Sequence, residues 1–231
     1  ALAFTSCTRE NVRGDRVIRN AVTDKDGNHY DAVKIGNQVW MQSNLRTKHF
    51  RDGSTIPRCS SYVDDYTEPC YYQSTMQQVP TFDEKKYGLY YNWAAVGDTR
   101  GLCPKGWHVP TVAEWNELLE YVGSKSEYVY GGNPQNIAKA LASNVGWVES
   151  NEPGAPGFEP ENNNATGFTA VPAGYYRIDY VPYGYITSFW SYVEYGLDHD
   201  LYLLDFWYNC VDLSWDYDVD GGGCSVRCVR D

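Results

Sequence analysis

Alternating apolar and polar residues near the start of the chain predict two β-hairpins that share a strand, because side chains of a half-buried strand point alternately to core and solvent. The alternation covers residues 16–23, 30–35 and 39–41. The turns between them carry Asp26-Gly27-Asn28 and Gly36-Asn37, which is hairpin chemistry. Asp24-Lys25-Asp26-Gly27 has the beginning of a calcium loop, but the ligand series stops there, so we predict a tight turn.

The strongest helix signal covers residues 112–122. Thr111 and Glu114 have the spacing of a capping box, and Gly123 stands where the helix should stop. Apolar residues recur at helical spacing, at Trp115, Leu118, Leu119 and Val122. We expect this helix to be scaffold, with Trp115 and Leu119 buried.

A second, shorter helix is predicted to begin at Pro134, with Asn133 as its N-cap, and to end near Ser143. It would bury Ile137, Ala138 and Leu141. Further strands are predicted at residues 87–96, 202–208 and 213–217. Two helices between groups of strands indicate an α+β fold, in one domain over residues 16–231.

Residues 48–84 show little periodicity and are expected to form a long loop, which a disulfide between Cys59 and Cys70 could staple. Residues 1–15 look like the remnant of a bacterial lipoprotein signal followed by a polar tether, with small residues before Cys7. If Cys7 carries lipid, six cysteines remain to pair; otherwise it is an odd thiol. We expect an outer-membrane lipoprotein or a secreted protein on the bacterial cell surface.

The charge distribution sets the last quarter of the chain apart. The net charge is −11, and between Ile178 and Val226 nine acids occur without one Lys or Arg. Nucleic-acid binding needs cations to displace phosphate counterions, so it is excluded. An anionic membrane surface is equally disfavoured, and no apolar run of about 18 residues would span a bilayer, so membrane contact is expected only through the lipid anchor.

The same region has the composition of a binding surface. Ten of the 21 tyrosines lie between Tyr175 and Tyr217, and tyrosine surrounded by short polar residues is how antibody paratopes are built. We predict a ligand-binding region at residues 175–223, although alternate strand residues there could instead face the core. The predicted contacts are Tyr192, Tyr195, Leu197, Asp198, His199, Asp200, Asp205, Trp207, Tyr208, Asn209, Asp212 and Trp215.

Several short motifs in a fixed order resemble the Fibrobacter succinogenes major paralogous domain family, common in Bacteroidetes surface proteins. They span most of the chain: Val33-Lys34-Ile35-Gly36, Gln38-Val39-Trp40-Met41, Tyr91-Asn92-Trp93, Leu102-Cys103-Pro104, Thr166-Gly167-Phe168 and Ser225-Val226-Arg227-Cys228. The resemblance implies a C-type-lectin-like fold, with a twisted antiparallel sheet, two helices and long loops. It also implies a disulfide between Cys103 and Cys228, and a function only by analogy.

The binding region departs from the family pattern in a particular way. From Leu197 to Leu213 the residues are Leu, Asp, His, Tyr, Phe, Asn, Cys and Val with one Trp. Apart from Trp207, these are residue types that can arise when the first two bases of an asparagine codon are randomised. It is similar to the variable proteins of diversity-generating retroelements, which serve as receptors or adhesins, although drift on an acidic surface would look the same. The expected ligand is a protein or glycan on a cell or phage surface.

Candidate chemistry is sparse. Asp216, Asp218 and Asp220 have calcium-loop spacing, but Arg227 holds the position of the bidentate Glu, so we expect no resident cofactor and keep calcium as an alternative. Cys210 and Cys224 could hold copper, as in formylglycine-generating oxidases, but a disulfide between them is the plainer expectation. We therefore expect a binding protein, not an enzyme; the alternatives are such an oxidase or a structural pilus component.

Overall fold

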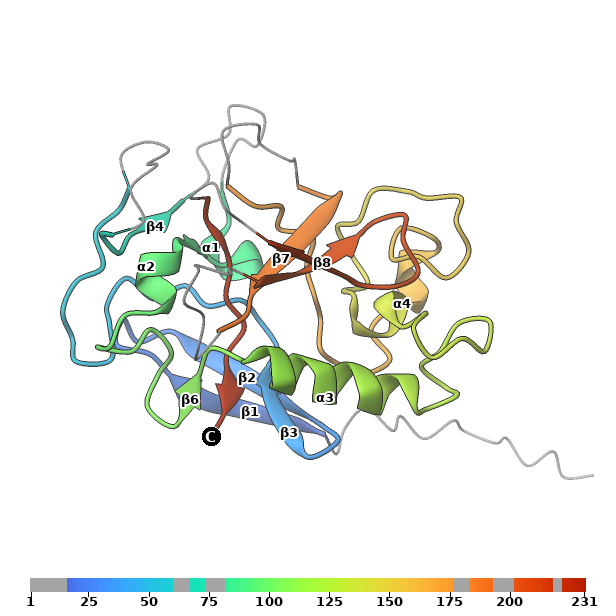
Figure 1. Ribbon diagram of the computed structural model, residues 1–231, viewed down its shortest axis with the longest axis horizontal. Helices are drawn as coiled ribbons and strands as arrows, with labels where there is room; N and C mark the ends of the chain where they lie inside the picture. Colours follow the sequence, from blue (N-terminus) through green and yellow to red (C-terminus); the bar gives the residue numbers. More distant parts are fainter. Residues whose placement is uncertain (1–15, 60–66, 74–81, 177–182, 193–201, 218–221) are drawn as a thin grey trace, which may run out of the picture.

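The computed structural model describes residues 16–59, 67–73, 82–176, 183–192, 202–217 and 222–231. In this part of the chain the predicted α+β class is confirmed, but two sheets are present where one was expected. Figure 1 shows the blue strands of the first sheet at the lower left, beside helix α3 (Val112–Gly123), and the orange strands of the second sheet above that helix. The two sheets pack together through two core clusters, one of which includes residues of this helix.

The first sheet brings the two ends of the described chain together. Its order is β1 (Val17–Thr23), β2 (His29–Ile35), β3 (Gln38–Met41), β11 (Val229–Arg230) and β6 (Trp107–His108). All neighbours are antiparallel. The predicted hairpins are confirmed, and so is the tight turn, where the Asp24 carboxylate accepts hydrogen bonds from the Asp26 and Asn28 N–H groups. Gly27 provides the left-handed backbone that this turn requires (φ 79°).

The second sheet contains the strands of the predicted binding region. Its order is β4 (Tyr71–Tyr72), β5 (Tyr90–Tyr91), β10 (Cys224–Ser225), β7 (Ile186–Trp190), β8 (Tyr202–Trp207) and β9 (Ser214–Tyr217). All pairs are antiparallel except β10 with β7. The strands predicted at residues 202–208 and 213–217 are confirmed within one residue. They form the β8–β9 edge of the sheet.

Helix α3 (Val112–Gly123) matches its prediction closely. Thr111 Oγ1 accepts the Glu114 N–H, and Glu114 Oε2 accepts the Thr111 N–H, which completes the capping box. Trp115 is buried as expected, packed between residues of both sheets. Leu119 is only half-buried, so that part of the prediction is wrong. The apolar stripe of the helix is narrower than its sequence spacing suggests.

The other helices are short. The predicted second helix is α4 (Ala138–Leu141), which starts four residues late because the Asn133 side chain caps a turn with the Gln135 N–H instead. The predicted strand at residues 87–96 is wrong except for β5. Helix α1 (Glu84–Tyr87) ends at Gly88, and Asn92 caps α2 (Trp93–Val96) by accepting the Ala95 N–H. A 3₁₀ turn, η1 (Pro160–Asn162), follows later in the chain.

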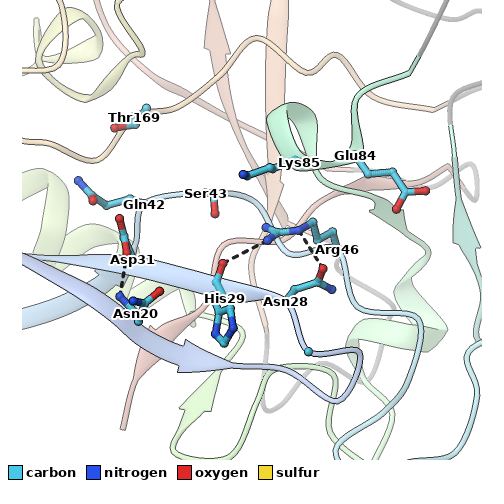
Figure 2. A pocket seen from close by; sticks show the side chains of 11 residues that line it. Asn20, Asn28, His29, Asp31, Gln42, Ser43, Arg46, Glu84, Lys85 and Thr169 are labelled. Carbon is cyan, nitrogen blue, oxygen red and sulfur yellow. Dashed lines mark hydrogen bonds between the residues drawn. The ribbon is translucent and has the colours of Figure 1, made fainter.

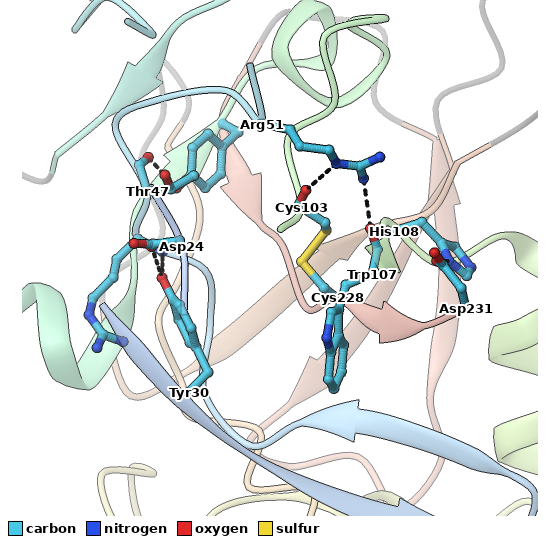
Figure 3. Close-up of a disulfide and its surroundings, with 11 residues drawn as sticks. Asp24, Tyr30, Thr47, Arg51, Cys103, Trp107, His108, Cys228 and Asp231 are labelled. Carbon is cyan, nitrogen blue, oxygen red and sulfur yellow. Dashed lines mark hydrogen bonds and ion pairs between the residues drawn. A yellow bond between two sulfur atoms is a disulfide. The ribbon is translucent and has the colours of Figure 1, made fainter. Parts of the chain in front are cut away.

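Two disulfides staple the described part of the chain. Cys103 pairs with Cys228, as predicted, and Cys59 pairs with Cys70, a pairing that the sequence leaves open. Figure 3 shows the second bond beside Arg51, whose guanidinium donates to the carbonyls of Cys103 (3.1 Å) and Trp107 (2.8 Å). The bond therefore ties the β6 segment to the C-terminal strand.

The predicted disulfide between Cys210 and Cys224 is wrong, since both side chains are thiols. Cys224 lies on β10 and Cys210 follows β8, and these strands flank β7 on opposite sides. Two strand spacings amount to about 10 Å, beyond the roughly 7 Å that a disulfide can bridge. Neither helical nor strand periodicity in the sequence reveals this separation.

Candidate functional site

The strands β7, β8 and β9 form the platform of the predicted binding region. Their register places Leu204 between Phe189 and Trp215, on the face that packs towards α3. Residues one position away, such as Leu203, belong to the opposite face and its separate core cluster. Both faces of β8 therefore pack into the protein along its length.

Seven of the twelve predicted ligand contacts are described, and they do not form one patch. Tyr195, Leu197, Asp198, His199 and Asp200 lie outside the described residues. Tyr192 follows the end of β7, whereas Asn209 and Asp212 lie in the β8–β9 turn at the opposite end of the strands. Five residues of strand separate the two ends by roughly 17 Å. Apart from Asp205, the described contacts therefore form two groups.

Tyr192 belongs to the first group. Its ring stacks on Trp93, with centroids 6.2 Å apart, and its N–H donates to the Pro110 carbonyl. It lines a cavity of about 370 Å³ together with Arg51 and His108. This contact joins β7 to the segment that precedes α3.

Asp205 lies inside the sheet rather than on its surface. It is only 4% exposed, and in register it lies between Ser188 and Ser214. A carboxylate in this position cannot reach a ligand on the outside without movement of the strands around it. Its burial follows from the central position of β8, which the charge pattern of the sequence does not reveal.

The second group surrounds the β8–β9 turn. Trp207 and Tyr208 are half-buried, and Asn209 and Asp212 are exposed. The Tyr208 ring meets Tyr185 edge-on at 5.2 Å, and its carbonyl accepts the Gly157 N–H at 2.8 Å. A side chain at Gly157 would collide with that carbonyl, so the loop approaches Tyr208 closely only because residue 157 is glycine. These contacts fix the turn.

A groove of about 580 Å³ lies beside this turn, between the end of α3 and β9. Its apolar wall is formed by Leu119, Ile137, Leu213 and Trp215. Glu120 and Asp212 supply carboxylates, and no Lys or Arg lines it. The groove therefore combines apolar surface with uncompensated negative charge, an arrangement suited to an apolar group beside a cation.

Two of the groove residues, Asp212 and Trp215, are predicted contacts, but the contribution of α3 is not foreseen from the sequence. The helical apolar spacing places Leu119 in the core, and Ile137 lies on a different element. The only sequence signal for Leu119 is its place beside Glu120 at the margin of the stripe. Sequence periodicity cannot separate the margin of a core from the wall of a groove.

The chemistry near the turn does not favour a reactive thiol. Burial, followed by the carboxylates of Asp212 and Glu152, raises the pKa of the Cys210 thiol. A raised pKa leaves less thiolate, which is the nucleophilic and metal-binding form. Among the described residues no group of three His, Cys, Asp or Glu side chains is arranged to hold a metal ion. Asp218 and Asp220 of the calcium-like spacing lie outside those residues.

The chain matches one known protein family over most of its length. The Fibrobacter succinogenes major domain matches residues 33–230. The chain belongs to this family. The match begins within β2 and ends at β11, so it includes the second sheet, both disulfides and the groove, whereas β1 precedes it. No curated protein and no solved structure matches the chain.

Membership of the Fibrobacter succinogenes major domain family agrees with the positions of its motifs in the fold. The Trp40 motif lies on β3, and the Arg227 motif precedes β11, which pairs with β3. In the described part of this family member no helix is long and apolar enough to cross a membrane. The family motifs thus lie mainly in the scaffold. They are separate from the groove and from the β8–β9 turn.

Proposed function

We propose that the protein is a cell-surface ligand-binding or adhesion protein that binds through its C-terminal region, residues 175–223. The observation that carries the proposal is the groove between α3 and β9, where the half-buried Leu119, Leu213 and Trp215 adjoin Glu120 and Asp212 with no cation among the lining residues. Aromatic anchors with a polar rim are typical of interface hot spots. A protein or glycan on a cell or phage surface is the proposed partner.

The charge of the region supports a cationic feature on that partner. Nine acids without a basic neighbour between Ile178 and Val226 repel one another, which lowers stability. The same field accelerates association with a positively charged partner and disfavours nucleic acid. We therefore propose a ligand that places a Lys or Arg beside the carboxylates and an apolar group against Trp215.

We further propose a C-type-lectin-like scaffold for this region. The pairing of the C-terminal strand β11 with β3 supports it, because it joins the two ends of the described chain in one sheet. Diversification by a retroelement is part of the proposal and rests on the residue set between Leu197 and Leu213. A reverse-transcriptase gene beside a near-copy of the segment encoding residues 192–219 would support diversification, and its absence would argue for drift.

The proposed location is the outer surface of a bacterium, with lipid on Cys7 or secretion of the chain. Its two disulfides support an oxidising compartment. Mass spectrometry of the protein purified from its native membrane fraction tests this proposal. A diacylglyceryl group on Cys7 would support it, and an unmodified Cys7 in a cytoplasmic fraction would oppose it.

The oxidase alternative requires two thiols that can face one metal ion. Cys210 and Cys224 lie on opposite sides of β7, and the pKa of Cys210 is raised. Both observations argue for the binding function over this enzyme class. The purely structural alternative predicts no selective ligand, and the following experiment addresses it.

Selection of displayed random peptides on the intact protein tests the binding function. Enriched peptides should carry a Lys or Arg next to an apolar or aromatic residue. They should lose binding to a Glu120→Gln, Asp212→Asn variant, in which the shape of the groove is kept but its charge is removed. The matched control is Glu117→Gln, an exposed acid on the same helix that does not line the groove. Equal losses in all variants, or no enrichment, would contradict the proposal.

A further inference from the structure

A second cavity, of about 850 Å³, lies far along the chain from the proposed binding region. Its walls come from the β1–β2 hairpin, the segment after β3 and the start of α1 (Figure 2). Every side chain that lines it belongs to a polar or charged residue, and these include Asp31, Gln42, Ser43, Arg46, Glu84 and Lys85. A volume of this size is in the range of pockets that hold small ligands, roughly 300–1,000 Å³.

Arg46 is held in position at this cavity before any ligand arrives. Its Nε donates to Asn28 Oδ1 at 3.2 Å and its Nη2 to the His29 carbonyl at 3.1 Å. The guanidinium lies 4.6 Å from the centre of the Tyr30 ring. The Tyr30 hydroxyl is itself fixed, since it donates to Asp24 at 2.6 Å. Arg46 Nη1 has no acceptor among the residues that the structure describes, so it can donate to a ligand.

The two carboxylates of the cavity are already neutralised by cations that do not line it. Asp31 pairs with Arg19 at 2.5 Å and accepts the Asn20 N–H. Glu84 pairs with Lys48 at 3.1 Å. Within the described ranges neither Arg46 nor Lys85 forms an ion pair. The cavity therefore has two unpaired positive charges, on a chain whose net charge is −11.

The geometry of Figure 2 brings these two cations into one space. Lys85 reaches into the cavity from α1, and Arg46 reaches in from the segment after β3, with Ser43 on the same wall. Neutral hydrogen-bonding groups surround them, including the amide of Gln42 and the hydroxyl of Thr169. A cation pair suits a carboxylate or sulfate, and amides and hydroxyls suit the hydroxyls of a sugar.

We propose that this cavity binds an acidic saccharide, with its carboxylate or sulfate between Arg46 and Lys85. The site is separate from the groove between α3 and β9, and it does not depend on the function proposed for that groove. The protein would then have a basic site for an anionic glycan on one part of its surface and an acidic groove on another.

Titration calorimetry of the intact protein with three trisaccharides of equal length tests the proposal. The probes are one carboxylated (a trigalacturonate), one sulfated and one neutral (a trigalactoside). We expect at least one acidic probe to bind roughly tenfold more tightly than the neutral probe, the effect of one charge-assisted contact. Its affinity should fall as salt is raised. Equal affinities for all three probes, or no binding, would overturn the proposal.

Three charge-removing variants distinguish a site from a general electrostatic effect. Lys85→Gln and Arg46→Gln should each weaken binding of the acidic probe roughly tenfold. The matched control is Lys86→Gln, which removes the same charge from the next residue of α1, where the amine lies over Tyr87 outside the cavity. It should change the affinity less than twofold. Because Lys85 is exposed, its variant should fold even if Arg46→Gln does not. Equal effects of Lys85→Gln and Lys86→Gln would overturn the proposal.

Discussion

Arg227 donates both its Nε and its Nη2 to one oxygen of Asn44, at 3.2 and 2.6 Å, across 183 residues of sequence. The guanidinium is fully buried, and its other N–H groups donate to the carbonyls of Met41, Phe168 and Thr169. Burial lowers the pKa of Arg227 to about 9. All five N–H groups are thus satisfied by neutral oxygens. Arg227, which precedes β11, therefore connects the chain at Met41 and Asn44 to the loop at residues 168–169.

The first prediction concerns this buried fork. Lys has three donors on a flexible stem and cannot reproduce five planar N–H groups, so Arg227→Lys would leave buried oxygens unsatisfied. We expect a loss of at least about 3 kcal/mol in the free energy of unfolding. Urea denaturation measures it. The control is Arg230→Lys on β11, which is exposed and should change stability by less than about 0.5 kcal/mol. Similar small changes for both variants would show that the fork is dispensable.

The second prediction is a pH dependence that arises from His108. Its Nε2 lies 2.7 Å from Glu114 Oε1 and its Nδ1 lies 2.7 Å from Asp231 Oδ1. The hydrogen bond to Glu114, and then that to Asp231, raise the pKa of His108 to about 9. A raised pKa means that the folded protein holds the proton more tightly than the unfolded chain. The stabilisation is therefore complete below pH 6.5 and is lost as the pH rises through about 9.

Comparison of His108→Gln with the wild-type protein at acid and alkaline pH measures this contribution. The side chain is 37% exposed, so solvent screens the interaction. We expect a difference of no more than roughly 1–2 kcal/mol near pH 6, decreasing towards zero above pH 10. A difference that does not depend on pH would mean that the imidazolium has no part in stability.

The third prediction separates two neighbouring leucines of α3. Leu118 is 1% exposed and packs in the core, whereas Leu119 is half-buried at the groove. Leu118→Ala should cost about 2–5 kcal/mol through lost packing and the cavity left behind. Leu119→Ala should cost less than about 1.5 kcal/mol, because solvent already reaches it. Equal costs would place Leu119 in the core, as its spacing in the sequence suggests.

The fourth prediction concerns the cysteines. Peptide mapping under native, non-reducing conditions should find Cys103 joined to Cys228 and Cys59 joined to Cys70, with Cys210 open to alkylation. The bond from Cys103 encloses 125 residues, against 11 for that from Cys59. Loop-closure entropy then predicts a loss of roughly 5 kcal/mol for removal of the first and roughly 3 for the second. The reverse order would contradict the entropic explanation.

The sequence predicts those elements whose signals are local. The β1–β3 hairpins follow from alternation and the turn at Gly27, and α3 follows from the Thr111–Glu114 capping box. The segment around Tyr90 fails for a physical reason. Its aromatic run resembles a strand, but the single side chain of Asn92 caps a helix turn that periodicity cannot show.

The binding region shows the limit of composition. Its strands were predictable, but the register of β7, β8 and β9 was not, and that register moves Tyr192 and Asp212 to opposite ends. Burial of Asp205 has the same origin. The contribution of Leu119 to the groove depends on the tertiary placement of α3 against β9, which no short motif encodes.

Hydrogen–deuterium exchange of the intact protein with a peptide selected on it tests the central proposal most directly. The proposal predicts slower exchange on binding at residues 119–124 and 211–216, which line the groove, and no change in the β1–β2 hairpin. Slower exchange in every segment at once would indicate general stabilisation by the peptide. The free energy of unfolding of the unbound protein is therefore measured as a reference. Protection confined to other segments, with both groove segments unchanged while the peptide is bound, would contradict a binding site between α3 and β9.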